Sequence, residues 1–198
     1  MLEELISKPR VIKSYYYYPK LILTINIAEY LYSQGKDVCI FNFDKINWQY
    51  YPYQINFVMK CNENSENLVF EAEDEAEVPL KFLLVTSIKN LKLGLPISEI
   101  QRVDQNLYKI NIDGQIRLFR IIEGKIVEEK IKGLADEILE LLKEYKELSL
   151  KEIVDIVSNK AMSSRENVRK EVYFLKEIGV VEIKDGKVSL NNYSRLKR

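Results

Sequence analysis

The stretch that decides the fold covers residues 10–43 and reads RVIKSYYYYPKLILTINIAEYLYSQGKDVCIFNF. It opens with the short segment Arg10–Lys13, which favours a strand. Over residues 21–35 the apolar side chains recur at helical spacing, and Gly35 stands where a helix C-cap glycine is expected. Residues 37–43 contain the almost wholly apolar run VCIFNF, as in a parallel strand buried on both faces. The pattern predicts a βαβ unit with a right-handed crossover.

Residues 11–44 resemble the opening of P-loop NTPases of the RecA/KaiC and ParA/MinD kind. The resemblance rests on the order strand, loop, helix, strand and on a helix of the form xxLAxNIAxxLAxxGxxV. It implies a phosphate loop over residues 14–21, in which Lys20 alone matches the pattern G-x-x-x-x-G-K-[ST]. Ser14 and Pro19 replace the glycines that let backbone N–H groups surround phosphate, and Leu21 replaces the hydroxyl that binds Mg²⁺. The resemblance therefore implies a P-loop-like fold without nucleotide hydrolysis.

The acidic residue that holds the metal in such enzymes is missing from the strand we expect to carry it. That strand, residues 81–87, ends in Thr86 and Ser87 where an Asp is required. The chain also contains no His, which removes the commonest general base and metal ligand. We expect no enzymatic activity, no metal and no cofactor; an enzyme function would depend on Lys20 alone. An unrelated βαβ domain that never bound nucleotide remains the alternative.

Two clusters of aromatic residues each follow a predicted strand. They consist of Tyr15, Tyr16, Tyr17 and Tyr18, next to Lys20, and of Trp48, Tyr50, Tyr51 and Tyr53. In a parallel sheet both clusters fall at the carboxyl edge, where open α/β folds bind ligands. Three uses remain open: packing over the sheet edge, anchoring a protein partner or a second copy, and stacking on single-stranded nucleic acid.

The segment that follows predicts an antiparallel addition to the sheet. Residues 105–131 alternate between apolar and polar side chains, with turns at Asp113-Gly114 and Glu123-Gly124, and predict a three-stranded meander. Residues 63–77 contain seven acidic residues and no basic residue. Such a run indicates a solvated loop, with a docking site for a basic partner as the alternative.

The pattern becomes helical after Gly133. Apolar residues at helical spacing mark three helices: Leu134, Ile138, Leu141, Leu142 and Tyr145; Ile153, Ile156 and Val157; Val168, Val172, Leu175 and Ile178. Ser149 with Glu152 predicts a capping box for the second helix, and Ser163 with Glu166 predicts one for the third. A hairpin with an Asp185-Gly186 turn follows. This order over residues 134–190 resembles a winged helix-turn-helix.

Charge is distributed unevenly over this region. Residues 134–159 hold three basic and seven acidic residues, whereas residues 160–198 hold ten basic and five acidic residues. We therefore expect the third helix and the hairpin to face DNA. The predicted contacts are Arg165, Arg169, Lys170, Tyr173 and Lys176 on the helix, and Lys184 and Lys187 at the wing. Winged helices also dock proteins or form dimers, which is the alternative.

Length and composition fit two domains. The chain has 198 residues, a net charge of zero and 46% hydrophobic residues. We expect a degenerate P-loop-like domain over residues 1–132 and a winged-helix domain over residues 133–198. Cys39 and Cys61 are expected to be buried thiols, with a disulfide as the alternative. Without an apolar signal or membrane-spanning run the protein is expected in the cytoplasm, and its composition suits a thermophilic, archaeal-like source.

The sequence thus predicts an α/β fold, with a mixed, largely parallel Rossmann- or RecA-like sheet, antiparallel edge strands and a small winged-helix domain. The expected function is non-enzymatic binding of duplex DNA, with protein interaction or assembly through the first domain. One alternative is an adaptor in a recombination, repair or replication complex whose winged helix docks protein. Another is a ligand-sensing transcription regulator.

Overall fold

The computed structural model describes residues 1–129 and 133–191. The chain divides into two compact units. The first comprises Met1–Asp113 and Phe119–Glu128, and the second comprises Gly114–Leu118 and the described residues from Glu129 onward. The predicted domain boundary after residue 132 adjoins residues 130–132, which lie outside the described residues.

One mixed sheet of eight strands organises the first unit, with the order β2-β3-β4-β1-β5-β6-β7-β8. The strands are β1 (Arg10–Lys13), β2 (Val38–Phe41), β3 (Glu66–Val69), β4 (Leu84–Ser87), β5 (Ile97–Asp104), β6 (Leu107–Ile112), β7 (Gln115–Ile122) and β8 (Lys125–Glu129). The strands β1 to β4 are parallel to all their neighbours, whereas β5 pairs parallel with β1 and antiparallel with β6. The predicted α/β class and the mixed sheet are confirmed.

The predicted strand-helix-strand segment is present, but its strands are not neighbours. Two strands, β3 and β4, lie between β1 and β2 in the sheet. The helix α2 (Tyr17–Ser33) begins four residues earlier than the predicted start at Leu21. Pro19 does not prevent this, because it lies in the first turn, where no N–H is needed. Gly35 has a φ of 75° and follows the helix end, as predicted.

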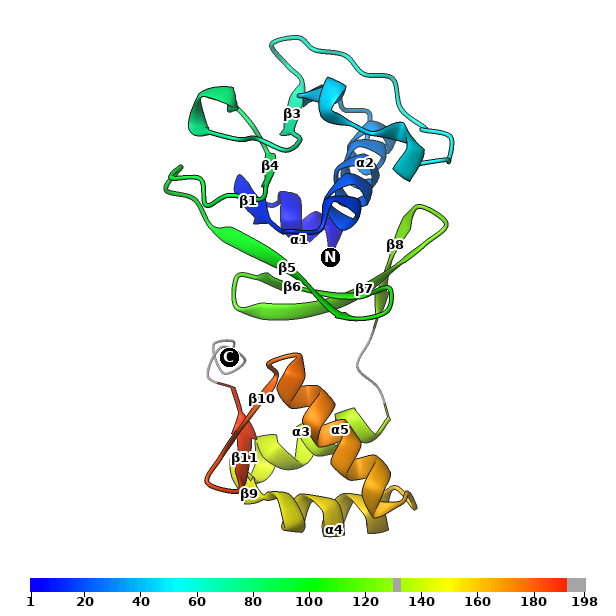
Figure 1. Cartoon of the computed structure of the whole chain (residues 1–198), viewed down its shortest axis with the longest axis vertical. Helices are drawn as coiled ribbons and strands as arrows, with labels where there is room; N and C mark the ends of the chain where they lie inside the picture. The colour runs from blue at the N-terminus through cyan, green and yellow to red at the C-terminus, as the bar shows by residue number, and fades with distance from the viewer. Residues whose placement is uncertain (130–132, 192–198) are drawn as a thin grey trace. The chain divides into compact units, whose positions relative to one another are not determined.

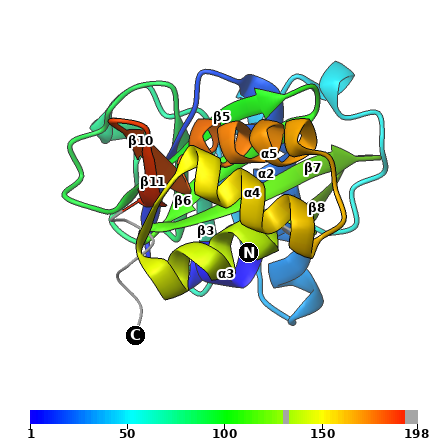
Figure 2. The same ribbon diagram turned by 90° about the horizontal axis from the view of Figure 1, so that it is seen from below.

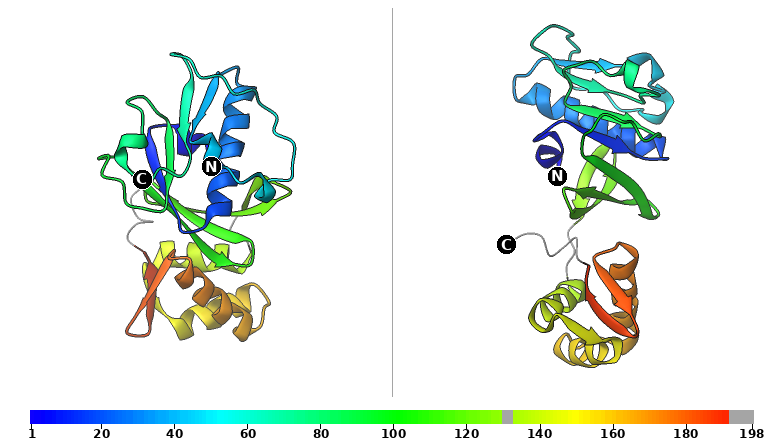
Figure 3. Two further views of the ribbon diagram at one scale, coloured as in Figure 1. Left: turned by 45° about the horizontal axis from the view of Figure 1, so that its top comes forward. Right: turned by 90° about the vertical axis from the view of Figure 1, so that its left-hand side faces the viewer.

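The parallel strands are buried on both faces. On one face α2 packs over Ile12, Leu68 and Leu84, and Figures 1 and 3 show this helix lying along the strands. The alternate residues Val11, Val69 and Val85 point into a second cluster. That cluster is completed by loop residues, among them Ala72, Val78, Phe82, Leu91 and Leu93. Burial on both faces explains why these strands are nearly continuous apolar runs.

The antiparallel part has one strand more than predicted. Besides the three strands of the predicted meander, β5 also belongs to it and turns into β6 at Gln105 and Asn106. Asp113 and Gly114 have φ values of 51° and 84°, and the turn at Glu123-Gly124 has the same handedness. These two turns are where the sequence predicted them. The short helix α1 (Leu2–Ile6) was not predicted; Arg10, which is fully buried, holds it by donating from Nε to the Leu5 carbonyl at 2.8 Å.

Cys39 and Cys61 form a disulfide, with their Cα atoms 4.7 Å apart. The expectation of two buried thiols is therefore wrong. The physical reason is a contact that the spacing does not show: Met59 bridges Val38 in parallel, and the Lys60 amide donates to the Val38 carbonyl at 2.9 Å. These contacts bring Cys61 alongside β2. The bond closes a loop that carries one of the two aromatic clusters.

The second unit contains three helices and a three-stranded sheet. In chain order they are α3 (Leu134–Tyr145), β9 (Glu147–Ser149), α4 (Leu150–Lys160), α5 (Arg165–Glu177), β10 (Val181–Lys184) and β11 (Lys187–Leu190). The helices contact one another pairwise (Figure 2), and the sheet order is β10-β11-β9. The core contains Ile138, Leu142, Ile153, Val157, Val168, Val172, Leu175 and Ile178, all of which belong to the apolar patterns that marked the helices.

Some local predictions in this unit need correction. The capping box of Ser149 and Glu152 is confirmed. The cap of α5 is Ser164 rather than Ser163: the Ser164 hydroxyl accepts from the Asn167 amide at 3.1 Å, whereas the Ser163 amide donates back to Ser158. Tyr145 and Ile156 belong to the apolar patterns that marked the first two helices, but their side chains are exposed.

Candidate functional site

Four parallel strands end at one edge of the sheet, and the segments that follow them form the first candidate site. After β1 the chain passes through Ser14, Tyr15 and Tyr16 and enters α2. The Ser14 hydroxyl accepts from the Tyr16 amide at 3.1 Å and donates to the Ile100 carbonyl at 3.0 Å. The predicted phosphate loop over residues 14–21 is therefore too long, because residues 17–21 are already helical. A three-residue connection offers few backbone N–H groups to a phosphate.

Lys20 lies in the first turn of α2 and is 1% exposed. Its Nζ lies 2.6 Å from Oε1 of Glu71, which directly follows β3 and Phe70. The Lys20 ammonium and the Glu71 carboxylate therefore form an ion pair, but their orientation does not make a hydrogen bond. Glu71 has a φ of 50°, and its amide donates to the Thr86 hydroxyl at 2.9 Å, which fixes the turn that carries the carboxylate. Lys20 thus faces a carboxylate of its own chain.

Sequence reasoning missed Glu71, because it interpreted residues 63–77 as one acidic loop. The segment in fact contains β3, which pairs with β2 and β4. The signal was the apolar run Leu68-Val69-Phe70 between the acidic residues; all three side chains are fully buried. Consequently the acidic group closest to Lys20 comes from the end of β3, whereas the sequence pattern predicts it at the end of β4.

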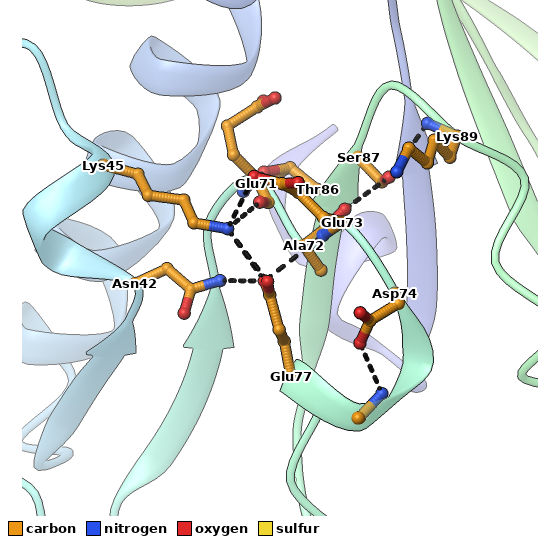
Figure 4. A network of polar contacts seen from close by, with 11 residues as sticks. Asn42, Lys45, Glu71, Ala72, Glu73, Asp74, Glu77, Thr86, Ser87 and Lys89 are labelled. Atoms are coloured by element: carbon orange, nitrogen blue, oxygen red, sulfur yellow. Dashed lines mark hydrogen bonds and ion pairs between the residues drawn. The ribbon is translucent and has the colours of Figure 1, made fainter.

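The acidic residues after β3 form an ordered polar network with Lys45 (Figure 4). The Lys45 Nζ donates to the Glu71 carbonyl at 3.0 Å and to a Glu77 carboxylate oxygen at 2.9 Å. The side-chain amide of Asn42 donates from Nδ2 to the same carboxylate at 2.7 Å. The hydrogen bond from Lys45 lowers the pKa of Glu77, so this group stays ionised. Asp74 accepts from the Ala76 amide and caps a short 3₁₀ helix. These acids stabilise the loop itself.

The two aromatic clusters meet. The rings of Tyr17 and Tyr50 lie 5.6 Å apart between centroids, and the Tyr17 hydroxyl donates to the Lys45 carbonyl at 3.0 Å and accepts from the Asn47 amide at 2.7 Å. Ring contacts also join Trp48 to Tyr51 and Tyr51 to Tyr53. The sequence therefore placed both clusters correctly at the same edge of the sheet.

Within these clusters the side chains differ in exposure. Tyr15, Tyr16, Trp48, Tyr50 and Tyr53 are exposed, Tyr17 and Tyr18 are half-buried, and Tyr51 is 3% exposed. Burial, with a contribution from the charge of Glu29, raises the pKa of Tyr51 to about 12. Its hydroxyl has no hydrogen-bond partner among the described residues. Tyr51 and Lys20 thus belong to the packed interior, which removes them from a partner-facing surface.

The second candidate site is the outer side of α5. Arg165, Arg169, Lys170, Tyr173 and Lys176 are all exposed, whereas Val168, Val172 and Leu175 on the opposite side of the helix are buried. Lys184 and Lys187 flank the turn between β10 and β11, and both are exposed. The structure thus places all seven residues predicted to face DNA on the surface.

Most of these basic groups already have acidic partners. Arg165 pairs with Asp155, and Lys170 with Glu166 at 2.8 Å. At the turn, Lys184 pairs with Glu182 and Lys187 with Glu147, each at 2.8 Å. The Glu147 hydrogen bond raises the pKa of Lys187. Within residues 1–129 and 133–191, Arg169 and Lys176 form no ion pair, so they are the most available cations on α5.

In the described part of the chain, His, Cys, Asp and Glu side chains form no group of three or more suited to a metal ion. None of the helices within residues 1–129 and 133–191 combines the length and the apolar character that spanning a bilayer demands. No protein-family model matches the sequence, and the comparisons with curated proteins and with solved structures found no match either.

Proposed function

We propose that this protein binds duplex DNA without catalysing a reaction, and that its second unit is a winged helix-turn-helix whose recognition helix is α5. The element order helix, strand, helix, helix, strand, strand supports this proposal, as does the sheet order β10-β11-β9. In a winged helix the third helix enters the major groove and the hairpin contacts the backbone. Its counterparts here are α5 and the turn at Asp185-Gly186.

The observation that carries the proposal is the row Arg169, Tyr173 and Lys176. These side chains lie one turn apart on the exposed side of α5, and Tyr173 is 49% exposed. An arginine suits guanine edges or phosphates, a lysine suits phosphates, and a tyrosine hydroxyl can donate to a phosphate oxygen. The ion-paired basic residues contribute less to DNA binding, because a phosphate must first displace the carboxylate that each of them contacts. Exposed ion pairs are worth only about 0–1 kcal/mol, so this exchange is feasible.

The test is titration of duplex DNA at several salt concentrations. For an Arg169→Ala/Lys176→Ala variant we expect weaker binding and a salt slope smaller by about two units, because two phosphate contacts no longer release counterions. If Arg169 contacts a base edge, truncating it should cost about 1–3 kcal/mol and relax specificity at that position. An Arg165→Ala/Lys170→Ala variant should lose less, and Lys184→Ala or Lys187→Ala should weaken all sequences alike.

Lys143→Ala/Lys151→Ala is the matched control, because it removes the same charge from α3 and α4, which lie in the acidic segment 134–159. It should bind as tightly as wild type. Equal binding by the Arg169→Ala/Lys176→Ala variant, or no binding by wild type at low salt, would refute the proposal. The favoured function would then be the adaptor, in which the winged helix docks protein; the neutral net charge and the four ion-paired basic residues favour that candidate.

For the first unit we propose a P-loop-like domain that has lost nucleotide binding. Its support is the pairing of Lys20 with Glu71 and the short connection after β1. We therefore expect ATP with Mg²⁺ to give no binding heat in calorimetry and no phosphate release. Micromolar affinity for ATP would contradict this expectation, and the Glu73→Ala variant, altered at an exposed position nearby, serves as the control for nonspecific effects.

A further inference from the structure

Glu166 is an exposed acidic residue among the basic residues of α5. It lies in the first turn of the helix, and its side chain is 74% exposed. Arg169, Lys170 and Tyr173 follow it at spacings of three, four and seven residues and are exposed as well, so the four side chains share one side of the helix. In a recognition helix the N-terminal residues contact base edges. A carboxylate therefore lies where a DNA-facing helix would meet the bases.

The contacts of Glu166 leave its carboxylate available. The sequence pattern pairs it with Ser163 in a capping box, but the N-cap is Ser164, whose hydroxyl accepts from the Asn167 amide. Within residues 1–129 and 133–191 its only ion-pair partner is Lys170, whose Nζ lies 2.8 Å from the carboxylate. The Lys170 side chain is 72% exposed, and an ion pair between two such exposed groups contributes little to stability. A ligand can therefore open this pair at small cost.

A carboxylate on this side of α5 opposes binding to DNA of arbitrary sequence. Non-specific binding comes from contacts between phosphates and basic side chains, and a negative charge beside Arg169 and Lys170 weakens it for every sequence alike. The loss is offset only where a base donates a hydrogen bond to the carboxylate. Glu166 would thus increase the ratio of specific to non-specific affinity, which is the quantity that determines target choice.

Cytosine is the base whose major-groove edge fits a carboxylate. It presents the N4 amine as a donor, whereas guanine presents two acceptors and thymine an acceptor and a methyl group. Adenine presents its amine beside the acceptor N7, which would repel a carboxylate. On the basis of the DNA binding proposed above, we propose that Glu166 selects a cytosine by accepting from its N4 amine. Lys170, released from the ion pair, then contacts a phosphate, and Arg169 stays available for a guanine.

Enrichment of bound DNA from a random duplex library tests this proposal, with the full chain as wild type, Glu166→Ala and Glu166→Gln. Wild type should enrich a site with at least one fixed C·G pair, and replacing the cytosine read by Glu166 should weaken binding about 5- to 150-fold. Glu166→Ala should lose the preference at that position and bind unrelated duplexes more tightly, because a negative charge is gone. Glu166→Gln should shift the preference to adenine, since an amide pairs with N6 and N7.

Glu144→Gln is the matched control, because it removes the same charge from an exposed position in α3. It should enrich the wild-type site. If both Glu166 variants enrich the wild-type site with every preference unchanged, the proposal is overturned while DNA binding through α5 stands. A lower melting temperature of these variants would then assign Glu166 to the helix dipole alone. No enrichment by wild type, or enrichment that Arg169→Ala/Lys176→Ala leaves unaffected, would overturn both the cytosine contact and the proposed function.

Discussion

Replacing Glu71 by Ala is expected to lower the free energy of unfolding by about 3–5 kcal/mol, because it leaves a buried ammonium group without its counterion. Lys20 is 1% exposed, and within residues 1–129 and 133–191 its only ionic partner is the Glu71 carboxylate, 2.6 Å from its Nζ. Urea denaturation at neutral pH, analysed with a fixed slope, measures the loss.

Further variants make this a decisive test. A Lys20→Met/Glu71→Leu double variant replaces the pair by apolar groups and should be much closer to wild type than either single change, because no charge is left buried. Measured together with the single variants Lys20→Met and Glu71→Leu, the double variant completes a mutant cycle that gives the coupling energy of the pair. Glu73→Ala, in the same loop but with a side chain that is 67% exposed, should change stability by less than about 0.5 kcal/mol. Similar losses for Glu71→Ala and Glu73→Ala would show that the pair contributes nothing.

The features that the sequence predicted well are those encoded locally. A two-residue turn needs φ above zero at both positions, so the dipeptides Asp113-Gly114, Glu123-Gly124 and Asp185-Gly186 identify three hairpins without any tertiary information. The capping box at Ser149 and the helical stripe of α5 depend likewise on residues three or four positions apart. The meeting of the aromatic clusters followed from one topological rule, that parallel strands end at a common edge.

The features that it missed depend on distant contacts. The strand β3 is only four residues long and is flanked by acidic residues, so its pattern resembles a loop until its neighbours β2 and β4 bury it. The exposed basic residues of α5 and of the hairpin were predicted, but two of their ion pairs were not. Arg165 of α5 pairs with Asp155 in another helix, and Lys187 of β11 pairs with Glu147, 40 residues away. The ion pair of Lys20 and Glu71 was missed for the same reason, because it forms only once the strand order brings the residue after β3 close to the start of α2.

Opening the disulfide between Cys39 and Cys61 is expected to lower the free energy of unfolding by about 3 kcal/mol. The bond closes a loop with a sequence separation of 22, and the cross-link restricts the unfolded chain by roughly this amount. Apart from the bond, the loop between β2 and β3 is held by two short 3₁₀ helices, one β-bridge, hydrogen bonds to the Tyr17 and Glu29 side chains, and the packing of Tyr51 and Phe57. Thermal unfolding of wild type with and without a dithiol reductant measures the effect.

The Cys39→Ser/Cys61→Ser variant provides the control for this experiment. It should melt at the temperature of the reduced wild type and should not respond to reductant. Trp48 is the single tryptophan of the chain and lies inside the closed loop, so its fluorescence reports on this segment. A hydrogen bond to the Tyr17 hydroxyl fixes one end of the loop, and the disulfide fixes the other. Reduction should therefore alter the fluorescence emission of Trp48 at temperatures below the main unfolding transition. Unchanged emission together with an unchanged melting temperature would show that packing alone holds the aromatic segment.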